Sequence, residues 1–456
     1  MSRIILITVF VMVASACSAP YQKTVVDNSV SAFVVADIPA DYEIEDVRKL
    51  PQDFGPFARN STIKPLDASC RNLLLSEFRR NYYAPWSESN PLSDISRSIQ
   101  TMQEHAERDF YGENRRPVPG KFLRELLANC DLGHFPSMNA RAIALVPTSM
   151  RVLPTAIPFF VKPDDFPFDA LQNAGLKMNE PIRVLHLSAD GVWAFAETND
   201  ANGWVPLRDI GFIRESQAAD RIKESLVVVV KDAAPIRDNR EPIAQRVKTG
   251  TLFPLAGEDE DAYEVFVAVQ SVRNEVRDVT VRVPKDSARR FPLDAGAETA
   301  ALIGNELLGK SYGWGELYQG RDCSALMRDF FLPFGIWLPR GSYNQIHSGK
   351  SISLSGLSPL EKERTIREKG VPFLTLLHMN GHIMLYVGSV GEKALIFHAL
   401  WKVKVKDGEG RDVTQVVGKS IISTLTPGSE LTLANGTLLE KIGSMLILSE
   451  RCGLPR

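Results

Sequence analysis

Apolar and polar positions along this chain change their spacing twice. In the first pattern, "DASCRNLLLSEFRRNYY" follows a plausible N-cap at Asp67. Its apolar residues lie near the 3.6-residue period of an amphipathic helix: Leu73, Leu74, Phe78 and Tyr82. Two later stretches, "SDISRSIQTMQEHAERDFY" and "KFLRELLANC", continue the same spacing. The pattern predicts a small helical N-terminal domain over residues 61–135.

In the second pattern, apolar residues alternate in short runs broken by Asp-Gly and Asn-Gly turns. The stretch "IRVLHLSADGVWAFAETNDANGWVPLRD" has a looser echo in "LFPLAGEDEDAYEVFVAVQSVRNEVRDVTVRVPKD". Two small β-barrels of five or six strands each fit this length. We therefore expect one barrel over residues 136–215 and a second over residues 216–290.

The last third of the chain mixes both spacings. It opens with a helical stretch, "AGAETAALIGNELLG", and continues with the strand-like runs "PFLTLL", "HIMLYVGSV" and "KALIFHAL". Helices followed by an antiparallel sheet are typical of an α+β domain. This domain is expected to cover residues 291–456, so the fold class is multidomain.

Composition narrows the function classes. The chain has 456 residues, 44% of them hydrophobic, and a formal net charge of -2. These values are typical of a folded multidomain protein and argue against disorder. A near-neutral charge also argues against a nucleic-acid partner.

The N-terminus carries an export pattern. Arg3 precedes an apolar run, Ile4 to Val13, interrupted only by Thr8. The run is too short to span a membrane and is typical of a signal peptide over residues 1–16. The small residues before Cys17 resemble the bacterial lipobox, which implies lipidation of Cys17 and a lipid anchor in the membrane. An ordinary secretory signal with a chance cysteine is the alternative. Ser18 resembles the outer-membrane sorting pattern of Gram-negative lipoproteins, so the expected location is the periplasm, behind a tether over residues 17–60.

Four cysteines follow the export segment: Cys70, Cys130, Cys323 and Cys452. An exported chain favours disulfides, but sequence alone does not fix their connectivity. Cys70 and Cys130 could pair within the N-terminal region, or both could be buried free thiols. These two alternatives stay open.

Cys323 stands apart, because no other cysteine lies within 120 residues of it. It follows a glycine-rich loop and opens an apolar helical stretch, "CSALMRDFF", with Asp322 as a natural N-cap. Backbone N–H groups at a helix N-terminus stabilise a thiolate and lower its pKa. Cys323 is therefore a candidate nucleophile if a histidine lies within reach.

Two histidines lie in a predicted hairpin. If the turn centres on Val390, His382 faces His398 across the ladder, and any register with the same parity keeps both on one face. A base with a polar group behind it is the arrangement that catalysis needs. His378, just upstream, is the main rival for the base.

Five motifs around these residues resemble, in order, those of the NlpC/P60 cysteine peptidases. They are Tyr312-Gly-Trp314-Gly, Asp322-Cys323-Ser324-Ala-Leu, Leu-Pro-Arg340-Gly-Ser, Gly-His382-Ile-Met-Leu-Tyr-Val-Gly and Ile-Phe-His398-Ala. The resemblance covers about residues 291–402. Both predicted barrels resemble bacterial SH3-type (SH3b) domains, the first more closely through its "GWVPLRDI" stretch. A pair of SH3b domains is a known neighbour of this peptidase domain.

The resemblance implies a papain-like core that cleaves peptidoglycan stem peptides, typically between D-glutamate and the diamino acid. Cys323 would be the nucleophile, His382 the base and His398 the orienting residue, with the hydroxyl of Tyr312 near the oxyanion. Substrate would contact Asp322, Ser324, Arg340 and Trp314. The implied partner is peptidoglycan or its muropeptides, and no cofactor is implied.

Two other interpretations remain open. The chain could be a lipid-anchored peptidoglycan-binding scaffold whose peptidase domain is inactive. Cys323 and the two histidines could instead hold zinc, although no paired C-x-x-C or H-x-x-x-H spacing supports a metal site. The sequence departs from the family at Glu316 and Ala325, where glycine is usual, and Glu316 adds a negative charge near the candidate site.

Overall fold

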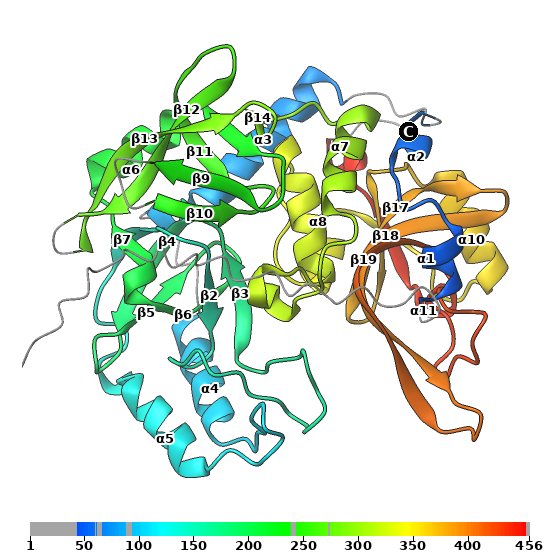
Figure 1. Cartoon of the computed structure of the whole chain (residues 1–456), viewed down its shortest axis with the longest axis horizontal. Helices are drawn as coiled ribbons and strands as arrows, with labels where there is room; N and C mark the ends of the chain where they lie inside the picture. Colours follow the sequence, from blue (N-terminus) through cyan, green and yellow to red (C-terminus); the bar gives the residue numbers. More distant parts are fainter. Residues whose placement is uncertain are drawn as a thin grey trace, which may run out of the picture.

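A computed structural model describes residues 43–59, 61, 66–87, 94–238, 243–271 and 274–452. The predicted signal peptide and Cys17 lie outside these residues. Figure 1 shows two β-structures on one side of the molecule and a third sheet on the other, with helices α7 (Ala297–Leu307) and α8 (Cys323–Phe331) between them. These three bodies correspond to the alternating stretches and to the mixed last third of the sequence.

The segment just before the helical region is no tether where it is described. Residues 43–59 form α1 (Glu45–Lys49) and α2 (Gly55–Arg59) and lie against the C-terminal sheet (Figure 1). Phe54 is fully buried among Phe330, Phe373 and Phe397. The side chain of Gln52 exchanges two hydrogen bonds with the backbone of Ile422, as a neighbouring strand would. The prediction of a tether over residues 17–60 is thus wrong for this part, because the segment completes the core and the edge of the sheet.

The predicted helical region contains α3 (Ala68–Tyr82), α4 (Ile95–Ala106) and α5 (Gly120–Asn129). As predicted, Asp67 caps α3 by accepting a hydrogen bond from the Cys70 amide. The three helices do not share a core of their own. Leu74 and Phe78 of α3 join the core of the C-terminal domain, while Met102 of α4 packs into the first β-structure. The helices therefore pack on the C-terminal domain and on the first β-structure instead of forming an independent domain.

The first β-structure is one antiparallel sheet with strand order β3-β2-β6-β5-β4-β1-β7. Its strands are β1 (Ala140–Ala144), β2 (Thr148–Arg151), β3 (Gln172–Leu176), β4 (Pro181–Leu187), β5 (Trp193–Glu197), β6 (Asn202–Pro206) and β7 (Ile210–Phe212). Trp204 is fully buried at its centre, where its indole N–H donates to the sulfur of Met102. The long β2–β3 loop, residues 152–171, reaches toward the C-terminal domain.

After α6 (Glu215–Lys223) comes the second β-structure, a sheet of order β13-β12-β11-β8-β14 with a β9–β10 hairpin packed on it. Its strands are β8 (Leu226–Val229), β9 (Ala234–Asp238), β10 (Ile243–Val247), β11 (Leu252–Glu258), β12 (Ala262–Gln270), β13 (Val276–Pro284) and β14 (Ala288–Arg290). Alternate valines fill its interior, as the period-2 spacing predicts.

The C-terminal domain has the α+β arrangement expected from the sequence. Its sheet, of order β15-β20-β16-β17-β18-β19, carries α8 on one face and α10 (Pro359–Lys369) on the other. The strands are β15 (Ser351–Ser353), β16 (Thr375–Met379), β17 (His382–Val390), β18 (Lys393–Lys406), β19 (Asp412–Thr424) and β20 (Ser444–Ile447). Two short helices, α9 (Ser342–Ile346) and α11 (Leu438–Lys441), complete it.

A disulfide joins Cys70 of α3 to Cys452 near the C-terminus. Neither alternative for Cys70 and Cys130 is therefore correct in full, since Cys130 is a buried free thiol and Cys70 pairs with a cysteine 382 residues away. The bond fastens the N-terminal helix to the far end of the C-terminal domain. In the described residues, no helix combines the length and apolar character that a membrane crossing requires.

Candidate active site

The candidate nucleophile opens α8, as the sequence predicts. Asp322 is the N-cap, and its carboxylate accepts a hydrogen bond of 2.9 Å from the Ala325 amide. The preceding loop folds tightly, because a Cβ on Gly313 would lie 2.4 Å from the Leu317 carbonyl oxygen. Only glycine fits this approach, which returns the chain to the start of the helix. Sequence and backbone geometry together thus fix Cys323 at the first helical position.

Beneath the thiol, Asp322, Ser324 and Arg340 form a buried cluster. Arg340 makes two hydrogen bonds to the Asp322 carboxylate, of 2.7 and 3.0 Å, and a third to the Ser324 hydroxyl. Asp322 also accepts from the Gly315 amide at 3.0 Å. Although burial opposes it, the Arg340 guanidinium holds the pKa of Asp322 well below its usual range. Their polar groups thus bind one another and fix the loop and the helix start. Contact of these three residues with substrate stays a prediction.

The Cys323 side chain contacts the start of strand β17. Its Sγ lies 3.9 Å from the Gly381 carbonyl oxygen and is also reached by the Ile383 amide, so it approaches the strand on both sides of His382. The expected lowering of the thiol pKa is wrong, however. Burial, together with the negative charge of Asp322, raises the pKa of Cys323 to about 12, and the helix amides do not offset this. The resting side chain is therefore a neutral thiol.

His382 and His398 form a direct pair. The Nε2 of His382 lies 2.8 Å from the Nδ1 of His398. Leu385 pairs with Phe397, and a bulge lies between Tyr386 and Gly388. In this register the two histidines lie diagonally across β17 and β18 and not directly opposite each other. The register centred on Val390 is thus wrong, but the shared face that it implied is confirmed by this contact.

Hydrogen bonds behind the pair fix both histidine tautomers. The Ser423 hydroxyl donates to the Thr424 carbonyl at 2.8 Å, so its oxygen accepts from Nε2–H of His398 at 3.0 Å. Nδ1 of His398 is then the acceptor, and Nε2–H of His382 must donate to it. The Nδ1 atom of His382 is left with a free lone pair, which is the form that a base toward Cys323 requires. Sequence reasoning missed Ser423, since nothing local marks it as a partner of His398.

His378, the rival base, does not join this chain of bonds. It pairs across the ladder with Ile383, and its Nε2 is buried without a hydrogen-bond partner among the described residues. Burial lowers its pKa, and His347 adds to this. Burial also lowers the pKa of His382 to about 4, so His382 is neutral at pH 7. The geometry favours His382 over His378 as the base.

An aromatic wall flanks the thiol. Tyr312 lies near Cys323 and Asp322. Burial raises the pKa of the Tyr312 hydroxyl, and the charge of Asp322 adds to this, so the hydroxyl stays a proton donor. Trp314 is 40% exposed and is thus the one predicted substrate-contact residue with a free face. Phe168, from the β2–β3 loop of the first β-structure, packs against both rings at centroid distances of 6.3 and 5.3 Å.

A buried charge network joins the two β-structures to α8. Arg321 makes a two-pronged contact with Asp232 of the second β-structure, at 2.6 and 3.0 Å, and binds Asp329 of α8 at 2.7 Å. Lys177 of the first β-structure also reaches Asp329. Glu316, expected to add a negative charge near the site, is instead neutralised inside this network by its main partner, Arg328. These partners are missed by sequence reasoning because they come from distant segments.

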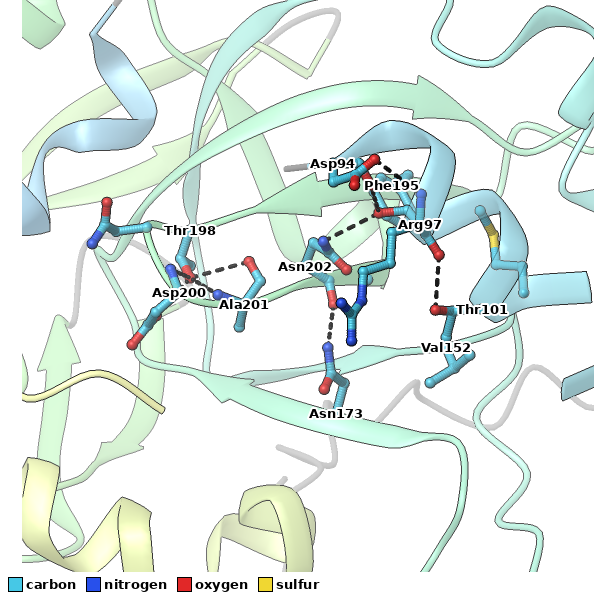
Figure 2. A pocket seen from close by; sticks show the side chains of 14 residues that line it. Asp94, Arg97, Thr101, Val152, Asn173, Phe195, Thr198, Asp200, Ala201 and Asn202 are labelled. Atoms are coloured by element: carbon cyan, nitrogen blue, oxygen red, sulfur yellow. Dashed lines mark hydrogen bonds between the residues drawn. The ribbon is translucent and has the colours of Figure 1, made fainter. Parts of the chain in front are cut away.

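A separate cavity of about 370 Å³ lies between α4 and the first β-structure. In Figure 2, Asp94, Arg97 and Thr101 from the α4 side face Asn173 and Asn202 of the sheet. None of the predicted catalytic residues lines this cavity, so it is not the candidate active site. The cavity is nevertheless connected to the candidate active site. The carboxylate of Asp200, which lines the cavity, accepts a hydrogen bond from the backbone amide of Arg340.

Metal binding was the weaker chemical alternative. Across the described ranges, no group of three or more His, Cys, Asp and Glu side chains is arranged to hold a metal ion.

Comparisons with known proteins identify three regions. Residues 309–417 match the NlpC/P60 family, residues 158–206 match an SH3 domain of the SH3b1 type, and residues 6–135 match the N-terminal NLPC_P60 stabilising domain. A search of curated proteins finds no match.

One solved structure shares the fold over most of the chain. The structure of an NlpC/P60 endopeptidase from Photobacterium damselae subsp. piscicida aligns with a TM-score of 0.81 at 23% sequence identity, covering 88% of this chain and 98% of that chain. An NlpC/P60 family protein from Bacillus cereus ATCC 10987 aligns with a TM-score of 0.46 at 18% identity, covering 68% of this chain and 100% of that chain. The predicted multidomain fold class is confirmed. The chain therefore ends in an NlpC/P60 family domain, preceded by a helical N-terminal region and an SH3b-type β-domain.

Proposed function

We propose that this protein is a cysteine peptidase that hydrolyses peptidoglycan stem peptides between D-glutamate and the diamino acid. The observation that carries the proposal is the ordered chain of bonds from His382 through His398 to Ser423, beside a cysteine at a helix N-terminus. The NlpC/P60 and SH3b1 matches support the class of substrate.

The proposed reaction starts from a neutral thiol and a neutral imidazole. As Sγ of Cys323 attacks the carbonyl carbon, its proton passes to Nδ1 of His382. The oxyanion receives hydrogen bonds from the Cys323 backbone N–H and the Tyr312 hydroxyl. His382 then returns the proton to the leaving amine, and a thioester remains. His382 then takes a proton from water as the water oxygen attacks the thioester carbonyl. The C–S bond breaks, Sγ takes the proton back from His382, and the new carboxylate is released.

The direct test is incubation of the purified protein with defined muropeptides, followed by mass spectrometry of the products. Cleavage between D-glutamate and the diamino acid supports the proposal. Binding of muropeptides without any cleavage would instead support the alternative of a peptidoglycan-binding scaffold with an inactive peptidase domain.

Ser423→Ala should lower kcat about tenfold while leaving KM nearly unchanged. Without the hydroxyl, His398 loses the acceptor that fixes its tautomer, and the lone pair on His382 no longer has to face the thiol. Steady-state kinetics on the cleaved muropeptide measure the split between kcat and KM.

Ser420→Ala is the matched control. Ser420 lies on the same strand and is also buried, but its hydroxyl donates to the Leu307 carbonyl and not to a histidine. This variant should keep its kcat. Equal losses of kcat in the two variants would show that any buried hydroxyl on β19 matters, and the tautomer assignment would fall.

The first β-structure is proposed to close one end of the cleft. Its Phe168 packs on Tyr312 and Trp314, and its Gln172 donates to the Gly315 carbonyl at 2.8 Å, so it stands beside the acyl side of the site. A closed end admits only stems whose N-terminal amine is free. Because an unpaired buried polar group costs about 1–3 kcal/mol, discrimination should reach about 100-fold.

The measurement compares free L-Ala-D-Glu-diamino acid with the same stem still joined to muramic acid. We expect kcat/KM to be far higher for the free stem. Equal values would reject the closed end and favour a role of the β-structures in holding the cell wall.

Lipidation of Cys17 and a periplasmic location at the outer membrane are likewise proposed, on the pattern of residues 1–18. The mature protein should partition with membranes, and Cys17→Ser should release it into the soluble fraction. A Cys17→Ser protein that still carries a lipid would contradict the proposal.

A further inference from the structure

A second cavity, of about 260 Å³, opens beside His382. It runs from His382 along β18 to the segment before α11. Apolar side chains, among them Met379, Leu400 and Leu433, form part of its wall. The volume lies below the roughly 300–1,000 Å³ typical of pockets for drug-sized ligands, so it suits a group of about amino-acid size.

The position of this cavity suits it to bind the residue whose amine is the leaving group. His382 must return its proton to the amine that leaves, so the leaving residue has to lie against His382. His382 lines the cavity, whereas Tyr312, Trp314 and Asp322 do not. Tyr312 and Trp314 instead pack with Phe168 of the first β-structure, which is proposed above to close the acyl end of the cleft.

The charges around the cavity are all of one sign. Lys402 and Lys404 are two residues apart on β18, and the register against β19 is continuous between them. Their side chains therefore project from the same face of the sheet. Lys441 of α11 is the third cation, and none of the described residues that line the cavity is acidic. Within the described part of the chain, none of the three ammonium groups is paired with a carboxylate.

Lys402 is also held in place. Its ammonium lies 5.6 Å from the ring centroid of Phe168, in a cation–π contact with the β2–β3 loop. It therefore stands at the boundary between the aromatic wall and the cavity, where a leaving residue would begin. The cavity next to the base thus combines apolar side chains with positive charges. Such a pocket can bind an aliphatic residue that carries a carboxylate.

We propose that this cavity is the leaving-group subsite, and that Lys402, Lys404 and Lys441 select a leaving residue with an aliphatic body and free carboxylate. The proposal rests on the proposed peptidase function and adds to it a charge requirement on the leaving side. A substrate whose carboxylates there are blocked as amides is then a poor one, even when its acyl side is unchanged.

The test uses two peptides with the same acyl part, L-Ala-γ-D-Glu. In one, the leaving residue is meso-diaminopimelate with free carboxylates, and in the other both of its carboxyl groups are amides. The full-length protein should show about a tenfold higher kcat/KM for the free acid, and salt should reduce this preference. In Lys402→Gln/Lys404→Gln the preference should fall to about twofold or less, while Lys402→Arg/Lys404→Arg should keep most of it.

Lys393→Gln is the matched control, since Lys393 is an exposed lysine at the other end of β18, outside the cavity. It should leave the preference unchanged. Equal kcat/KM for acid and amide in the wild-type protein, or an undiminished preference in the Gln double variant, would overturn the subsite.

A binding measurement separates this inference from the proposed function. If neither peptide is cleaved, the proposed function fails, and calorimetric titration of Cys323→Ala protein with both peptides decides the subsite. Tighter binding of the acid that is lost on adding the two Gln substitutions supports it. Equal binding of acid and amide would reject it.

Discussion

Cys323→Ala is expected to reduce turnover of muropeptides by at least about 10⁴-fold while the protein keeps its fold. The thioester cannot form without Sγ. The substitution removes one atom from a half-buried first helical position, and Asp322 still caps the helix through the Ala325 amide. Turnover is measured by mass spectrometry of products, and the fold by thermal unfolding.

Cys130→Ala is the matched control, because Cys130 is the other free cysteine among the described residues. It is fully buried in the core between α5 and the first β-structure, so its loss should lower the melting temperature but leave turnover intact. Opposite effects of the two substitutions separate chemistry from packing. Full turnover by Cys323→Ala protein would refute the assignment of the nucleophile.

The histidines provide an independent check on the same site. His382→Ala should be almost as severe as Cys323→Ala, since nucleophile and base act as a unit. His398→Ala should cost roughly 10- to 10³-fold, because its work is to orient the imidazole of His382. Complete loss at His378 with none at His382 would reverse the assignment of the base.

Local chemistry made part of this site predictable. Asp322 and Cys323 were placed by a capping residue ahead of an apolar helical face, which depends only on neighbours in sequence. The shared face of His382 and His398 follows from strand alternation. It is unchanged by an error in register as long as the paired residue numbers still add up to an even number. Periodicity alone likewise separated the helical, all-β and α+β parts of the chain.

What the sequence could not provide depends on contacts between distant segments. The partner of Cys70 lies at the other end of the chain, and no spacing rule identifies it. Phe54 reads as one apolar residue in a proline-containing segment, yet it fills the core of the C-terminal domain. The pKa of Cys323 was misjudged for the same reason, since the helix N-terminus is visible in sequence but the degree of burial is not.

The buried network around Arg321 is the clearest long-range feature, and breaking it should have the largest effect on stability. Arg321→Met leaves Asp232 and Asp329 without their shared guanidinium in a site where Arg321 is 1% exposed. Removing one partner of a buried ion pair typically costs about 3–5 kcal/mol. For a cooperative unit of the size of the C-terminal domain, this loss corresponds to a fall in melting temperature of roughly 10 °C, measured by calorimetry at pH 7.

The pH dependence of this loss distinguishes an electrostatic cause from a packing defect. Although burial opposes it, Arg321 lowers the pKa of Asp232 to about 2 in the folded protein. A carboxyl with a lowered folded pKa adds stability above its unfolded pKa of about 3.9 and loses it as the pH falls toward 2. In Arg321→Met protein the unpaired carboxyl instead has a raised pKa and can take up a proton to become neutral. The difference in melting temperature between wild type and variant should accordingly shrink as the pH is lowered below 7.

Arg282→Met provides the matched control, because Arg282 pairs with Asp259 on the exposed surface of the second β-structure. The same chemical change there should leave the melting temperature unchanged, since water and salt screen the pair. If Arg321→Met were as harmless as Arg282→Met, the network would not hold the second β-structure against α8. A large but pH-independent loss would point to the missing volume of the side chain and not to its charge.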